Sequence, residues 1–558
     1  MGAINITVFG GLNVNDAPES LAGRSMQHYE GTWSHRIGVS GPVPVEASRM
    51  VNCELERQRV RQRKGSTAIV DLGAAGLNVL VAGDEILEGI EYRNPVTNAR
   101  VQVLVGKKSI YTNQSGTFTQ VNNNSGTPYT HADPNVTRVG LARVDGHLFI
   151  GLDGANKIQV YRNGANLDPE MSGGNLYFHT NGGASTPITG VWGDGCFLVA
   201  GVHGRLVFCD GSTTVQYTAP FAPWDLGGAL AGNKAARARV LAMASHAPLF
   251  ADSLSEVLYI LGAGEAEVLT GFTLSDVFQG ITGAPPPISH RAVISTAGWL
   301  CYMAQDGGLW GINGANVINL GRRLKAFDGT GPLDDISLAS AETTADAFYD
   351  ADRKQAVWLY PSAGSASNDR AVVLDLQLGE PRTGEAQSQY EERVRCLYWT
   401  GTAYATIYQA FGMVVGATSG GTLWQMHNGD SDFATVAIAA DWQGPDFSAG
   451  WEINHKSWLD AFVRNSPSGN WYAALKFYVN RAPDASVAFQ VHQGAGASYY
   501  GSAVYGTDVY TDGTVTRFST DVDLYAETLR PGLSNSEIGE TFILNALEVR
   551  YRVGAEER

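Results

Sequence analysis

Short apolar segments separated by tight turns dominate the middle of the chain. Each consists of one apolar stretch, a turn that contains Gly or Asp, and a second apolar stretch. Runs of this length with turn residues between them predict strand–turn–strand units. The unit recurs at 103–111, 146–161, 196–208, 256–269, 299–312, 355–375 and 403–424. Successive units begin roughly 42 to 60 residues apart, a spacing typical of the blades of a β-propeller.

We therefore expect an all-β fold in which residues 68–435 form a β-propeller of about seven blades. A single four-stranded sheet cannot bury both of its faces, whereas sheets stacked around an axis bury each face against a neighbour. No strict sequence word recurs between the units, so the repeat is one of structure. The best helical candidate is the short stretch Asn233–Ala244, which a loop excursion also explains.

The two ends of the chain follow other patterns. Residues 25–48 have little periodicity, and we expect residues 1–67 to form an extended N-terminal arm that ends in a basic strand. Residues 436–558 contain longer, more alternating segments, at Trp471–Val479, Arg517–Val522 and Ala546–Val553. Alternation of apolar and polar residues is typical of strands with one buried face. The pattern predicts a C-terminal β-sandwich-like domain over 436–558.

Four arginines, Arg57, Arg59, Arg61 and Arg63, lie two residues apart near the end of the arm. Alternate side chains of a strand share a face, so we expect one strand face with four guanidinium groups. Such a face can protect a solvated edge strand. It can also form an intersubunit contact to acidic groups, and nucleic acid is a third possible partner. We name these four residues as candidate intersubunit contacts.

Composition narrows the possible partners. The formal net charge is −16, and a protein of this charge repels DNA as a whole, because DNA binding needs clustered Lys and Arg. The same negative charge is compatible with a channel wall past which DNA slides without sticking.

The five cysteines form no CxxC pair and no metal-binding spacing, which favours buried thiols in a chain that folds in a reducing cytosol. Residues 1–11 lack the basic start and apolar run of a signal peptide, and no window approaches the roughly 18 apolar residues of a membrane span.

Catalytic motifs are lacking in the sequence. It contains no GxSxG, Walker A, HExxH or zinc-binding pattern, so we expect no enzyme activity, no cofactor and no metal site. Asp306–Trp310 is similar to the end of the Asp-box turn of sialidase-like propellers, but it occurs once, and we interpret it as a structural turn.

A second candidate surface is aromatic: Tyr499, Tyr500, Tyr505 and Tyr510 lie in a Gly/Ser-rich stretch. These tyrosines suit a protein interface, an ordinary loop or a glycan-binding site.

Both ends of the chain resemble one protein family. The opening Gly10–Leu21 resembles the "GGLN…D.P..L" start of phage tail propeller proteins, in which a basic RxRxG-type strand follows, here Arg57–Gly65. The end, Phe542–Tyr551, resembles their closing strand, with its "h.l.l..leveY" pattern. The middle agrees with the family only in spacing. The chain thus resembles the tail nozzle, also called tail hub or stabilisation protein, of short-tailed double-stranded DNA bacteriophages.

This resemblance implies a structural virion protein of the phage tail that assembles in the host cytoplasm. In the family, a ring of subunits, usually a hexamer, lies below the tail adaptor ring, extends the DNA channel and holds tail fibres or spikes. Genomic DNA would pass without specific binding, and nothing would insert into a membrane. The best-known nozzles are longer than this chain, which leaves open a minor tail component with another ring number. The alternatives are a carbohydrate-binding, receptor-binding propeller and a glycosidase.

Overall fold

The structure is a computed structural model of the 558-residue chain. It describes residues 2–6, 9–12, 45–56, 59–74, 79–95, 97–113, 116–123, 126–161, 167–168, 170–172, 175–179, 185–187, 193–228, 230–246, 249–250, 253–254, 256–269, 279–326, 331–382, 384–391, 393–447, 455–466, 468–469, 471–493 and 516–553.

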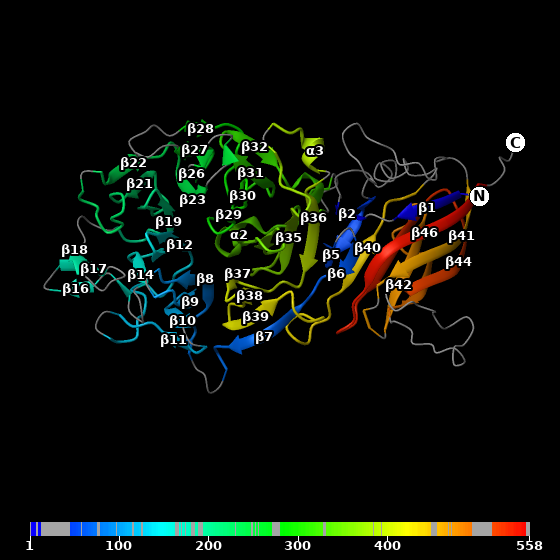
Figure 1. The fold of residues 1–558 in the computed structure, drawn as a ribbon, viewed down its shortest axis with the longest axis horizontal. Helices are drawn as coiled ribbons and strands as arrows, with labels where there is room; N and C mark the ends of the chain where they lie inside the picture. Colours follow the sequence, from blue (N-terminus) through cyan, green and yellow to red (C-terminus); the bar gives the residue numbers. More distant parts are fainter. Residues whose placement is uncertain are drawn as a thin grey trace.

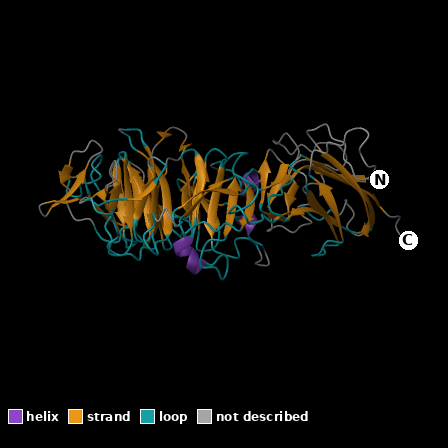
Figure 2. Ribbon diagram, turned by 90° about the horizontal axis from the view of Figure 1, so that it is seen from below, coloured by secondary structure: helices purple, strands orange, loops and turns teal. Residues whose placement is uncertain are grey.

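The expected all-β fold is confirmed, because strands and turns make up nearly all of the described chain (Figures 1 and 2). The helices of the described part are short: η2 (Arg322–Leu324), α2 (Leu338–Thr344) and α3 (Gln387–Glu391). None of the described helices is long and apolar enough to cross a membrane.

Small antiparallel sheets form the larger part of the molecule. The first three are β8 (Ile86–Arg93), β9 (Arg100–Gly106), β10 (Ile110–Asn113) and β11 (Phe118–Gln120); β12 (Val139–Val144), β13 (His147–Leu152), β14 (Gln159–Tyr161) and β15 (Leu167–Asp168); and β19 (Leu198–Val202), β20 (Arg205–Cys209), β21 (Thr214–Tyr217) and β22 (Gly232–Ala235). The next two are β23 (Val240–His246), β26 (Val257–Gly262), β27 (Ala266–Leu269) and β28 (Gln279–Ile281); and β29 (Val293–Ser295), β30 (Leu300–Met303), β31 (Leu309–Asn313) and β32 (Asn316–Asn319). Two more begin with β33 (Asp346–Asp350), β34 (Gln355–Tyr360), β35 (Arg370–Asp375) and β36 (Arg395–Thr400), and with β37 (Thr406–Ala410), β38 (Met413–Ala417) and β39 (Thr422–Met426).

Local sequence explains how these strands form. The second strand of a unit is mostly apolar, and β13, β26 and β34 are buried at every position. The turn from β12 to β13 has two residues, Asp145 and Gly146, with φ of 46° and 74°. Two positive φ values match the right-handed twist of a hairpin, and Asp–Gly is a preferred pair for such a turn.

The sheets stand side by side around one axis, as in a β-propeller (Figure 1). Each unit contributes its first strand to the wall of a central cavity, and the apolar faces of neighbouring sheets form shared clusters. The last unit is completed by β7 (Ser66–Asp71) from the N-terminal part of the chain, which pairs with β39. The inner strands β37 and β8 contact each other, so the last unit meets the first and the ring closes.

A nine-stranded sheet joins this ring to the C-terminal residues. Its order is β33-β34-β35-β36-β4-β40-β45-β42-β43. The added strands are β4 (Arg49–Val51), β40 (Ala440–Gln443), β45 (Leu529–Asn535), β42 (Tyr472–Val479) and β43 (Val487–His492). The sheet that begins in the ring therefore continues into the C-terminal part without a break.

A six-stranded sheet packs against the outer half of the nine-stranded sheet. It contains β44 (Thr516–Ala526), β41 (Lys456–Asn465), β46 (Ile543–Val553), β6 (Arg59–Gln62) and β5 (Cys53–Glu56), and β1 (Gly2–Ile6) pairs with β46. Trp458 of this sheet and Trp442 of the nine-stranded sheet are fully buried in one shared core. The C-terminal residues thus form two facing sheets with the N-terminal strands added to them.

Remaining strands lie outside these sheets. They are β2 (Phe9–Leu12) with β3 (Val45–Ala47), β16 (Glu170–Ser172) with β17 (Asn175–His179) and β18 (Ser185–Pro187), and β24 (Leu249–Phe250) with β25 (Ser253–Leu254). The helix considered for Asn233–Ala244 is wrong, because this stretch contains the end of β22 and most of β23. Its alanines favour a helix locally, but Val240, Ala242 and Met243 are buried between two sheets, and this packing outweighs the propensity.

Candidate functional site

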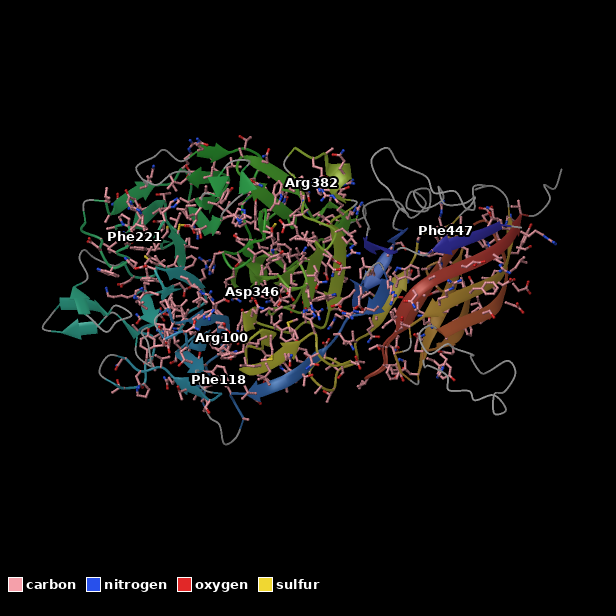
Figure 3. All side chains as sticks on the ribbon, in the orientation of Figure 1. Arg100, Phe118, Phe221, Asp346, Arg382 and Phe447 are labelled. Carbon is pink, nitrogen blue, oxygen red and sulfur yellow. The ribbon has the colours of Figure 1, made fainter. Side chains whose placement is uncertain are left out.

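The central cavity of the ring is the candidate functional site. Its volume is about 780 Å³, which is within the usual range of ligand sites. It is lined by residues of β8, β12, β19, β23, β33 and β37 and by the segment that enters β29. Figure 3 labels Asp346 near the middle of the ring.

One end of the cavity is crossed by side chains from four units. Arg138, just before β12, donates to the carboxylate of Glu342 in α2, which lies on the far side of the ring. The same guanidinium lies over the ring of Phe197, 5.1 Å from its centroid, and Phe197 packs edge-on against His290 at 5.2 Å. Only about 20 Å³ of free space remains among these residues. These side chains therefore narrow the cavity at this end.

The opposite end is more exposed. Arg100 makes a two-point ion pair with Glu91, with both distances at 2.8 Å, and its side chain is 43% exposed. The guanidinium of Arg143 donates to the backbone carbonyl of Glu91. Arg100 also lies over the ring of Phe411, at 5.4 Å. The cavity is a pocket that opens at these residues.

Two carboxyl groups deep in the pocket share one guanidinium. Arg291 Nε lies 2.8 Å from Glu88 Oε2 and 3.6 Å from Asp346 Oδ1. The Thr406 hydroxyl donates to Glu88 Oε1 at 3.0 Å, and the Ile407 backbone N–H donates to Asp346 Oδ2 at 2.9 Å. Arg291 also donates to the Ala405 carbonyl at 2.6 Å. The cluster links the first unit, through β8, to the units of β29, β33 and β37.

This environment favours the neutral form of the carboxyl groups. Burial and the neighbouring Asp346 together raise the pKa of Glu88 to about 7, against the opposing effect of Arg291. Burial also raises the pKa of Asp346, against the effect of Arg291. The pair can therefore hold a proton near neutral pH. Among the described residues, no three His, Cys, Asp or Glu side chains are placed to hold a metal ion.

The arginine run does not form one strand. Residues 53–62 make a hairpin of β5 and β6, and Arg57 lies outside the described residues. Arg59 is exposed, whereas Arg61 is half-buried and pairs with Glu54 at 2.8 Å and Glu56 at 2.9 Å. The expected face of four guanidinium groups is wrong, because the chain turns within the run and Arg63 is buried.

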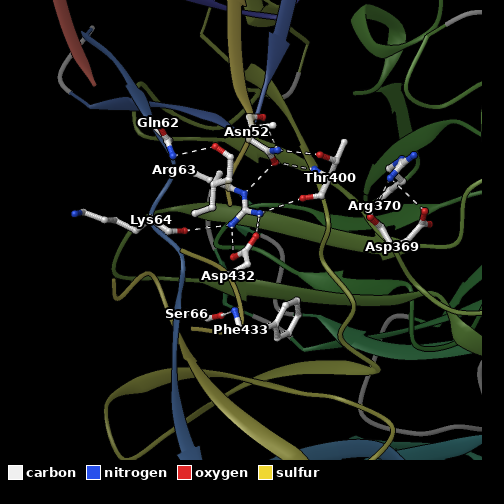
Figure 4. Close-up of polar contacts among 12 residues, drawn as sticks. Asn52, Gln62, Arg63, Lys64, Ser66, Asp369, Arg370, Thr400, Asp432 and Phe433 are labelled. Atoms are coloured by element: carbon white, nitrogen blue, oxygen red, sulfur yellow. Dashed lines mark hydrogen bonds and ion pairs between the residues drawn. The ribbon is translucent and has the colours of Figure 1, made fainter. Parts of the chain in front are cut away.

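Arg63 belongs to the junction between the hairpin and the ring (Figure 4). Its guanidinium forms a two-point ion pair with Asp432, one contact of which is 2.9 Å long. It also donates to Asn52 Oδ1 at 3.0 Å and to the Thr400 carbonyl at 3.1 Å, and it lies over the ring of Trp399. The side chains of Arg63 and Asp432 are only 6% and 5% exposed, so neither is available to another subunit.

The other sequence candidates have different outcomes. Tyr499, Tyr500, Tyr505 and Tyr510 lie outside the described residues, so their role stays a prediction. The structural turn at Asp306 is confirmed, since its carboxylate accepts the Gly308 N–H at 2.7 Å and the Trp310 indole N–H at 3.1 Å.

Sequence reasoning missed Glu88, Arg291 and Asp346. These residues are distant in the chain, and each lies in or beside a short apolar segment without a motif around it. The only local sign of a site is a charged residue in or next to an apolar strand. This sign is weak, because many charged residues near strands are exposed to solvent and have no function. Their proximity is visible only once the ring is closed.

Comparisons with known proteins identify no family. No family model and no curated protein matches the sequence. One similar solved structure is BBS1N in complex with ARL6DN, with 9% identity over 65% of this chain and 98% of that chain, at a TM-score of 0.36. PorZ of Porphyromonas gingivalis has 12% identity over 66% of this chain and 44% of that chain, at 0.36. The exo-β-1,3-galactanase of Phanerochaete chrysosporium has 10% identity over 77% of this chain and 99% of that chain, at 0.25. The likeness is weak in all three.

Proposed function

We propose that this protein is a structural component of a bacteriophage tail, a nozzle-like subunit that forms a ring around the path of the DNA. The observation that carries the proposal is the nine-stranded sheet, which joins the propeller-like ring to the C-terminal sheets. A subunit that positions neighbours must transmit force without bending, and a continuous sheet connects its two halves through hydrogen-bonded strands.

The segments that resemble the phage family lie in one region of the fold. The basic strand β6 pairs with the closing strand β46. Arg61 is opposite Ile543, and Val60 is opposite Leu544. The opening Gly10–Leu12 is part of β2, which contacts β5, the partner of β6. This clustering supports the view that the resemblance reflects one structural unit, since unrelated matches have no reason to be neighbours.

In this proposal, copies of the chain form a ring, usually a hexamer, below the tail adaptor ring and hold tail fibres or spikes. The net charge of −16 keeps passing DNA from adhering to the wall. The protein is located in the virion tail, and it performs no catalysis. Of the four candidate arginines, Arg59 is the one described as exposed, so it is the best candidate for the intersubunit contact.

Electron microscopy of the purified chain tests the proposal. We expect elongated two-part subunits that assemble into closed rings. Arg59→Glu should give subunits that are folded but do not assemble into rings of copies. Arg382→Glu, at an exposed position of the propeller-like ring within one subunit, should leave assembly unchanged. A chain that remains monomeric at every concentration, or that is missing from the tail particles of its phage, would contradict the proposal.

One observation favours a second candidate, a glycosidase. Such enzymes use two neighbouring carboxyl groups, and Glu88 and Asp346 are neighbours in a pocket. Against this candidate, both groups are held by Arg291, and their side chains are only 14% and 4% exposed. A turnover assay with polysaccharides, on the wild type and on Glu88→Gln, separates the two candidates: hydrolysis that disappears in the variant would favour the enzyme.

A further inference from the structure

The ring is held from inside at the place where its last and first units meet. We call this contact of β8 with β37 the seam. Glu88 of β8 accepts a hydrogen bond from Thr406 at the start of β37. On the same two strands, Gly89 packs so closely against Tyr408 that an added Cβ would overlap the tyrosine ring. Polar contacts and close packing therefore both hold the seam.

The charges at the seam do not balance when every group is ionised. Glu88 and Asp346 would supply two negative charges, and Arg291 supplies one positive charge between them. All three side chains are mostly buried, so water screens their interactions poorly. An excess negative charge in such a place is costly unless a proton neutralises it.

Other groups around the cluster do not remove this imbalance. Glu91 is already paired with Arg100, and Arg143 donates to a backbone carbonyl at the pocket opening. Burial lowers the pKa of His290, beside Arg291, to about 3, so this imidazole stays neutral above that pH. Tyr408 accepts a hydrogen bond from Gln102 and contributes no charge at neutral pH, because burial raises its pKa.

We propose that the Glu88–Arg291–Asp346 cluster is a proton-dependent clamp that holds the ring closed when its carboxyl pair shares one proton and loosens the seam when that proton leaves. In the protonated state, one carboxylate and one guanidinium balance each other, and the other carboxyl group is neutral. Loss of the proton leaves two carboxylates facing one guanidinium. Their repulsion acts between β8 and β33, on either side of β37, and weakens the seam.

The direction of the effect follows from the raised pKa. A carboxyl group whose pKa is higher in the folded state stabilises the fold below its ordinary pKa, and this contribution is lost as the pH rises through the folded value. For Glu88 the window runs from about 4.5 to about 7. The seam is therefore firm in mild acid and weaker in mild alkali. This device is independent of the tail function proposed above.

Thermal unfolding as a function of pH tests the clamp. Between pH 5 and pH 8, the melting temperature of the wild type should fall by a few degrees relative to that of Glu88→Gln, whose neutral amide cannot lose a proton. Glu265→Gln, at an exposed turn between β26 and β27, is the matched control and should follow the wild type. Equal pH dependence in the wild type and Glu88→Gln would overturn the proposal.

Hydrogen exchange of the wild type provides a test that needs no variant. After correction for intrinsic exchange rates, amides of β8 and β37 should exchange several-fold faster at pH 8 than at pH 6. Amides of β42, which is far from the seam in the C-terminal part of Figure 1, should show no such change. Unchanged protection of β8 and β37 across this range would also overturn the proposal.

Discussion

Arg63 is part of a basic run in the sequence, yet its guanidinium is buried among Asp432, Asn52 and Thr400. Two residues earlier, Arg61 reaches Glu54 and Glu56 on its own hairpin. Each of these arginines finds a partner within the chain because the hairpin forms the edge of the six-stranded sheet that contacts β36 of the ring. Alternate arginines therefore have structural roles that their spacing does not reveal.

Two neighbouring carboxylates, Asp430 and Asp432, allow the contribution of the buried Arg63–Asp432 ion pair to the free energy of unfolding to be measured. Asp432 holds the buried Arg63, whereas Asp430 pairs with Lys64 at 2.6 Å near the surface, where the two side chains are 36% and 39% exposed. Asp432→Asn should lower the free energy of unfolding by about 3 kcal/mol or more, because it leaves a buried charge without its counterion. Asp430→Asn should change it by less than about 1 kcal/mol. Denaturant unfolding checks both, and similar losses in the two variants would show that burial does not set the energy.

Two neighbouring units of the ring approach each other closely where glycines leave room for the backbone. Gly140 of β12 and Gly151 of β13 are opposite each other, and a Cβ on either would overlap backbone atoms of residues 196–197, which lead into β19. Backbone atoms cannot move aside as the end of a flexible side chain can. These glycines thus set the spacing between the second and third units.

Gly140→Ala should therefore destabilise the protein, by about 1–3 kcal/mol, which is the usual cost of overpacking. Gly73→Ala is the control, because the nearest atoms to its added Cβ are 3.5 Å away, an ordinary contact. Denaturant midpoints measured for both variants and the wild type give the comparison. A neutral Gly140→Ala would mean that the second and third units can separate at little cost.

On the scale of the whole molecule, the ring and the C-terminal sheets share strands and core. β4 lies between β36 and β40 within the nine-stranded sheet, and β7 completes the last unit of the ring. One stretch of chain, residues 49–71, thus passes through both halves of the molecule. Separate domains usually meet at modest interfaces and move relative to each other, but shared strands oppose such motion.

Calorimetry should consequently show one cooperative unfolding transition, with equal calorimetric and van't Hoff enthalpies. Val51→Pro should separate it into two, because proline removes a hydrogen-bond donor from the central strand β4. Two resolved transitions in the wild type would show that the halves unfold independently and would also weaken the case for a rigid tail subunit.

The amino-acid sequence by itself determined where strands form. The apolar runs that became β13, β26 and β34, and the alternating runs that became β42 and β46, are recognisable because neighbouring residues alone fix the periodicity of a strand. The tertiary structure decided which distant strands pair, as for β7 with β39 and β4 with β36. It also decided that Glu88, Arg291 and Asp346 meet, and that residues 233–244 are not helical. These outcomes depend on contacts between segments far apart in the chain, and local periodicity carries no information about such contacts.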